Sequence, residues 1–154
     1  MWDKHPEGPD TLWHALRARY LSGVSRPFRA WLPALSWAAV LFALSSIPGG
    51  ALPTVTGWQI DKVVHGMLYL VLGLLCARAL GATTRMTGAS LALLATLIAT
   101  GYGVTDELHQ LLTPRRSCDW RDVVADGAGA LLGAGVAVSV IAHSNRRGKV
   151  TPAV

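Results

Sequence analysis

The chain has 154 residues, of which 51% are hydrophobic and only 15% are charged. A soluble domain has about 25% charged residues, so this composition, with a mean hydropathy of +0.37, indicates one small membrane domain. The pI is about 9.8, but the Lys and Arg residues stand at the ends of hydrophobic segments, so we expect no nucleic-acid partner. Two cysteines make no disulfide framework.

Residues 1–30 contain no continuous apolar run and do not read as a standard signal peptide. Within them, the stretch DTLWHALRARYL has Leu12, Leu16 and Tyr20 at roughly helical spacing beside two arginines. This pattern predicts a short amphipathic helix at the membrane surface, with Asp10 as its N-cap.

Four hydrophobic segments follow, each close to the roughly 20 residues that a helix needs to cross a bilayer. They are residues 31–47, 63–80, 87–105 and 123–142. One such segment would also fit a buried helix of a soluble protein, but four in a short chain favour an all-α, polytopic membrane protein. We therefore expect four transmembrane helices in a compact bundle with the lipid bilayer as partner.

The predicted organisation has three parts: a cytoplasmic N-terminal segment (1–30), a four-helix membrane domain (31–142) and a disordered cytoplasmic tail (143–154). Four spans place both termini on one side of the membrane. Ten of the 14 Lys and Arg residues fall on that side, and the positive-inside rule then puts both termini in the cytoplasm. The other face is external.

The fourth segment is rich in glycine, with Gly127, Gly129, Gly133 and Gly135. Gly129 and Gly133 form a G-x-x-x-G pattern, which allows two helices to approach closely. We expect this helix to lie inside the bundle rather than to face lipid.

Polar residues interrupt the external ends of these segments, where charge is costly and usually marks function. Asp61, His65 and Tyr69 stand at i, i+4 and i+8, so they line one stripe of the second helix, beside Lys62. Alone, each has a structural interpretation; Lys62 and Tyr69, for example, are typical of residues that anchor at the interface.

A second group follows the third segment: Asp106, Glu107, His109 and Gln110. If this stretch is helical, a carboxylate lies beside an imidazole, a pair suited to general acid–base chemistry. A solvated helix end is the alternative.

A third group contains Arg116, Asp119, Asp122 and Asp126. The three aspartates share the helix face that continues through Gly129, so we expect them to point inward. Arg116 and Arg121 can neutralise them, and Arg also offers a planar fork for phosphate or carboxylate. A purely structural Arg–Asp network remains the alternative.

These motifs, in this order and spacing, resemble the VanZ-like family from about residue 35 to residue 135. They read D-K-x-x-H-x-x-x-Y from Asp61, D-E-x-H-Q from Asp106, P-x-R from Pro114 and D-x-x-x-D-x-x-G from Asp122. The resemblance implies a four-helix integral membrane protein, and the family's namesake confers low-level resistance to the glycopeptide teicoplanin. Two positions depart from the family pattern: Arg115 replaces its usual glycine, and Asp126 its usual asparagine.

Two hypotheses of function follow. In the first, the protein is a membrane enzyme that acts on an anionic cell-envelope or lipid-linked molecule. The catalytic candidates are Asp61, His65, Asp106, Glu107 and His109. The substrate-binding candidates are Lys62, Tyr69, Gln110, Arg116, Asp122 and Asp126.

In the second hypothesis the same groups bind or transport an envelope amphiphile without turnover. No Ser or Cys stands in a recognised nucleophile motif. No cofactor is identified, and no metal site is assigned: the two histidines and nearby carboxylates are Zn²⁺ or Mn²⁺ ligand types, but no H-x-x-x-H or H-E-x-x-H pattern is present.

Overall fold

The computed structural model describes residues 9–51 and 58–147. They form α1 (Pro9–Ser45), the short 3-10 helix η1 (Gly49–Ala51), α2 (Trp58–Thr83), α3 (Gly88–Gln110) and α4 (Trp120–Arg147), and this part of the chain contains no strand. Each long helix has a segment long and apolar enough to cross a membrane: Arg26–Ser45, Ile60–Thr83, Gly88–Gln110 and Trp120–Arg147. The predicted all-α, four-span fold is confirmed.

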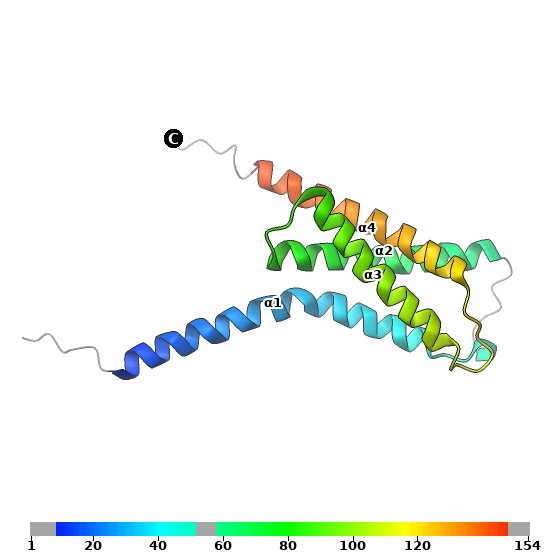
Figure 1. Cartoon of the computed structure of the whole chain (residues 1–154), viewed down its shortest axis with the longest axis horizontal. Helices are drawn as coiled ribbons and strands as arrows, with labels where there is room; N and C mark the ends of the chain where they lie inside the picture. The colour runs from blue at the N-terminus through cyan, green and yellow to red at the C-terminus, as the bar shows by residue number, and fades with distance from the viewer. Residues whose placement is uncertain (1–8, 52–57, 148–154) are drawn as a thin grey trace, which may run out of the picture.

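Helix α1 is a single helix of 37 residues that joins the predicted amphipathic segment to the first span. It continues through Pro27 and Pro33, and its N-terminal half extends away from the other helices (Figure 1). The indole N–H of Trp37 donates to the carbonyl of Leu68 in α2 at 2.9 Å. The hydroxyl of Tyr102 in α3 donates to the carbonyl of Ala38 at 2.6 Å. Helices α2 and α3 are therefore both hydrogen-bonded to the same turn of α1.

Helices α2 and α4 pack with their backbones in direct contact. A Cβ atom added at Gly129 would collide with the Gly66 carbonyl, and one added at Gly133 would collide with the Leu70 carbonyl. In return, Gly73 of α2 faces the backbone of Ala130. The expectation that the glycine face of α4 packs inside the bundle is confirmed.

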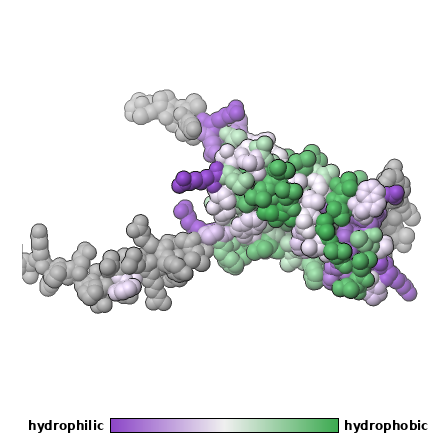
Figure 2. All heavy atoms as spheres, in the orientation of Figure 1, coloured by the Kyte–Doolittle hydropathy of each residue, from purple (hydrophilic) through white to green (hydrophobic). Residues whose placement is uncertain are grey.

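The outer surface of the bundle is apolar across its middle. Figure 2 shows green, hydrophobic side chains between two purple, hydrophilic ends. Leu93, Leu97, Leu132 and Val140 are each more than half exposed. Such a surface is stable only in contact with lipid or another apolar partner, which supports the bilayer as the environment of this chain.

Two helices end later in the chain than the sequence predicted. Helix α2 was predicted to end at Gly81 but continues to Thr83. The low helix propensity of one glycine and one threonine costs about 1 kcal/mol or less per residue, which packing against the other helices offsets. Helix α4 extends to Arg147, so the first residues of the predicted disordered tail are helical. The remainder of that tail lies outside the described residues.

Candidate functional site

Polar side chains from three helices gather at one end of the bundle. Helix α2 begins, α3 ends and α4 begins there, at the right of Figure 1. Asp61 and Asp122 occupy the first turns of α2 and α4, where the helix dipole stabilises negative charge. Every acidic side chain within residues 26–51 and 58–147 lies at this end: Asp61, Asp106, Glu107, Asp119, Asp122 and Asp126.

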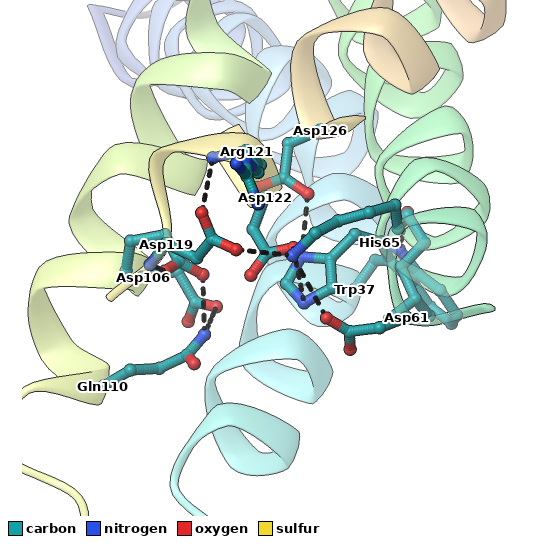
Figure 3. Close-up of polar contacts among 12 residues, drawn as sticks. Trp37, Asp61, His65, Asp106, Gln110, Asp119, Arg121, Asp122 and Asp126 are labelled. Atoms are coloured by element: carbon teal, nitrogen blue, oxygen red, sulfur yellow. Dashed lines mark hydrogen bonds and ion pairs between the residues drawn. The ribbon is translucent and has the colours of Figure 1, made fainter. Parts of the chain in front are cut away.

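The carboxylates of Asp61, Asp119 and Asp122 point toward one another (Figure 3), and Lys62 is the cation that pairs with all three. Its Nζ lies 2.9 Å from Oδ2 of Asp119 and 3.2 Å from Oδ2 of Asp61, and it also pairs with Oδ1 of Asp122. An ammonium group has three hydrogen atoms to donate, and these three acids take them all. Lys62 was predicted to hold an anionic substrate group; in this structure its positive charge is paired with three carboxylates.

His65 reaches the deeper acid of α4. Its Nδ1 lies 3.1 Å from Oδ1 of Asp126, and its Nε2 lies 4.0 Å from Oδ1 of Asp122. The Asp126 side chain is 1% exposed, whereas that of His65 is 15% exposed. When Asp126 is ionised its carboxylate only accepts hydrogen bonds, so in that state Nδ1 donates to Asp126 and Nε2 is the nitrogen on the side of Asp122.

Gly103 of α3 makes the space for this pair. A Cβ atom at Gly103 would lie 2.7 Å from Oδ2 of Asp126 and 3.2 Å from Cε1 of Tyr69. Tyr69 is 2% exposed, so the predicted stripe of α2 does turn inward at its deep end. Gly103 was not singled out from the sequence, and no motif there would have shown it.

Glu107 connects the end of α3 to the loop before α4. Its Oε2 accepts the backbone N–H of Asp119 at 2.9 Å, and its Oε1 accepts the amide of Gln110 at 3.0 Å. The same amide donates to Oδ2 of Asp106 at 3.4 Å. Glu107 is 1% exposed. This arrangement fixes the position of Asp119, and through it one of the three partners of Lys62.

Asp119 lies outside the membrane-spanning segments, and its pKa is lowered from the ordinary value. The largest cause is the backbone N–H of Arg121, which donates to its carboxylate at 3.0 Å. The ion pair with Lys62 lowers the pKa further. Asp119 was not among the predicted site residues, although its spacing with Asp122 and Asp126 was visible in the sequence.

His109 does not join the other candidates. Its ring stacks on Phe42 of α1 with centroids 4.4 Å apart, and its Nε2 lies 3.1 Å from Oγ of Ser46. The physical reason is helical periodicity: His109 is two residues after Glu107, which places it on a different face of α3. The predicted pairing of Asp106 with His109 is absent from the contacts of the described residues.

Arg116 is also separated from the acids that it was expected to neutralise. Among residues 9–51 and 58–147 it forms no ion pair; its backbone N–H donates to the Thr113 carbonyl at 3.2 Å, and its Nε is buried without a protein partner. Lys62, rather than Arg116, neutralises Asp119 and Asp122, because it projects from α2 toward the start of α4. Arg121 likewise turns its guanidinium away, over the ring of Trp120 at 5.8 Å.

Arg115 has a left-handed backbone conformation, with φ of 58°. This region favours glycine because a Cβ atom strains it. The position is held by its neighbours: Gly49 donates its N–H to the Pro114 carbonyl at 3.1 Å, and a Cβ atom at Gly49 would strike the Arg115 carbonyl. The structure thus explains why a glycine suits the middle of the P-x-R motif.

Ligand-type atoms of Asp61, His65 and Asp122 lie within 4.8 Å of one another. Carboxylate oxygens and an imidazole are suitable ligands for Zn²⁺ or Mn²⁺. However, Asp61 and Asp122 both pair with Lys62, whose ammonium already supplies the positive charge there. The residues present therefore suit an internal cation better than a bound metal.

The chemistry that this end of the bundle offers is proton transfer at His65. One ring nitrogen lies against a buried carboxylate, which orients the ring, and the other nitrogen is left to exchange a proton. Three of the predicted site residues carry a buried polar atom without a hydrogen-bond partner among the described residues: the Tyr69 hydroxyl, Oδ1 of Asp106 and Nε of Arg116.

Comparison with known protein families identifies the family of this chain. The model of the VanZ/LLP1 family matches residues 11–142, which include all four long helices except the first two residues of α1 and the last five of α4. No curated protein and no solved structure matches the chain. Because the family model covers most of the sequence, this chain belongs to the VanZ/LLP1 family.

Proposed function

We propose that this VanZ-like membrane protein acts at the external side of the cytoplasmic membrane on an anionic cell-envelope or lipid-linked amphiphile, with His65 as the group that exchanges a proton with it. The observation that carries the proposal is the pair between His65 and the buried Asp126 at 3.1 Å. Structural packing alone does not require a carboxylate that is 1% exposed, because burying it costs free energy.

The anionic group of the substrate is assigned to the arginines that precede and begin α4. Arg115 and Arg121 are exposed, and Arg116 has a buried Nε without a protein partner among the described residues. A guanidinium group suits a phosphate or carboxylate through two parallel hydrogen bonds. Lys62 already pairs with three carboxylates, which supports the choice of the arginines for this role.

The distribution of Lys and Arg supports the external placement. Both termini and the connection between α2 and α3 carry ten of the 14 basic residues, so the positive-inside rule assigns that end to the cytoplasm. The polar end then faces outward. A reporter fused after Val154 should be active in the cytoplasm, and one inserted at Ser117 should be active outside.

A second candidate function is binding or transport of the same amphiphile without chemical change. It is favoured by the buried Tyr69 hydroxyl and Oδ1 of Asp106, which lack hydrogen-bond partners among the described residues; a polar head group that entered between the helices would supply them.

The test uses the purified full chain in nanodiscs with a polyprenyl phosphate as probe. Bound and altered lipid are measured by mass spectrometry for the wild type, His65→Gln and the control His143→Gln, which lies near the other end of α4. The enzyme hypothesis expects turnover that only His65→Gln abolishes. Tight binding with no turnover supports the second candidate, and absence of binding by the wild type rejects both.

A further inference from the structure

A groove lies between α2 and α4 at the end of the bundle opposite the polar site. Its volume is about 550 Å³, within the roughly 300–1,000 Å³ of small-molecule sites. Leu74 of α2 and Val136, Val140 and Ile141 of α4 line its apolar part. These residues are inside the membrane-spanning segments.

The mouth of the groove is polar and positive. Arg78 stands one turn beyond Leu74 on α2, and Ser144 and Asn145 stand one turn beyond Val140 and Ile141 on α4. The polar residues therefore lie nearer the end of the bundle than the apolar ones. Arg78 is exposed and forms no ion pair with any described residue.

The charges around the mouth are of one sign. Within residues 26–51 and 58–147 all acidic side chains are at the other end of the molecule, whereas Arg85, Arg146 and Arg147 share this end with Arg78. An occupant must therefore combine an apolar chain with an anionic head. A neutral lipid would fill the apolar part but would leave Arg78 without a partner.

We propose that this groove binds one anionic phospholipid of the adjacent leaflet. Its phosphate contacts the guanidinium of Arg78, Ser144 and Asn145 donate to its head group, and one acyl chain lies along Leu74, Val136 and Val140. Basic residues at the ends of membrane helices recognise anionic head groups in this way. The proposal is independent of the chemistry at His65, which lies at the opposite end.

The experiment measures lipid retention by the full chain in detergent, using native mass spectrometry with phosphatidylglycerol and phosphatidylcholine. We expect phosphatidylglycerol to be retained preferentially. Arg78→Gln should weaken its retention about tenfold, as expected for loss of a charge-assisted hydrogen bond. The control Arg85→Gln removes the same charge from the connection between α2 and α3, outside the groove, and should leave retention unchanged.

A second variant tests the groove itself. Val140→Trp places a large apolar side chain at a position that is 62% exposed, so it should fold, keep Arg78 and still lose phosphatidylglycerol. Equal retention of the two lipids, equal loss in Arg78→Gln and Arg85→Gln, or full retention by Val140→Trp would each overturn the proposal. So would a stable dimer that Val140→Trp dissociates, because a second copy would then be the occupant.

Discussion

The Nδ1 atom of His65 in α2 lies 3.1 Å from Oδ1 of Asp126 in α4. This contact joins two helices inside the polar end of the bundle, whereas the second predicted histidine, His109, contacts Phe42 and Ser46 of the α1 side instead. The two histidines therefore differ in surroundings: His65 contacts a buried carboxylate, whereas His109 contacts an aromatic ring and a hydroxyl group.

We expect His65→Gln to abolish an envelope phenotype of this protein, such as altered sensitivity to a glycopeptide, while the protein remains abundant in the membrane. The glutamine amide can still donate to the buried Asp126 carboxylate, so that charge keeps a partner, but an amide cannot exchange a proton at neutral pH. His109→Gln is the matched control and should keep the phenotype. A full phenotype in His65→Gln at normal abundance would contradict the proposed role.

Lys62→Ala should destabilise the protein more than Arg116→Ala. Removal of Lys62 leaves the carboxylates of Asp61, Asp119 and Asp122 without their common cation. Loss of one partner of a buried ion pair costs about 3 kcal/mol, whereas Arg116 forms no ion pair with a described residue. The measurement is thermal unfolding in detergent, and the reverse order of the two variants would contradict this reading of the site.

Lys62→Met should create a divalent-metal site from Asp61, His65 and Asp122, whose ligand atoms lie within 4.8 Å of one another. With the ammonium removed, Zn²⁺ supplies the missing positive charge. We expect Zn²⁺ to raise the unfolding temperature of Lys62→Met and to do so far less for the wild type. Adding His65→Ala to Lys62→Met should remove the effect; a shift that persists would mean that the metal binds elsewhere.

Gly129→Ala should destabilise the bundle by about 2 kcal/mol or more, as overpacking does. The added methyl group meets the Gly66 backbone, which has no flexible side chain to move. Gly135→Ala is the control on the same helix: nothing lies within 4 Å of its added Cβ atom. It should be neutral or stabilise by up to about 1 kcal/mol through helix propensity. Similar losses in both variants would contradict the observed packing.

Arg115→Gly should stabilise the loop before α4 by up to about 1 kcal/mol. Glycine relieves the strain at φ of 58°, although its greater freedom in the unfolded chain offsets part of the gain. Ser117→Gly, at a neighbouring position without a positive φ, should be neutral or destabilising. Chemical denaturation of the two variants against the wild type gives the comparison, and equal effects would argue against strain at Arg115.

The sequence by itself determined the spans, because length and hydrophobicity of a segment are local properties. It also predicted that the glycine face of α4 lies inward, since Gly129 and Gly133 share one helical face. The inward turn of Asp122, Asp126 and Tyr69 followed from the same periodicity, because the cost of burying charge requires partners inside the bundle.

Only the tertiary structure decided which partners meet. Sequence proximity predicted that Arg116 would neutralise the aspartates at the start of α4. In the structure Lys62 of α2 pairs with them instead. His65 rather than His109 faces an aspartate because the close α2–α4 backbone contact places one beside Asp126 and leaves the other against α1. Such pairings depend on rotation and separation of helices, which side-chain packing between distant segments sets.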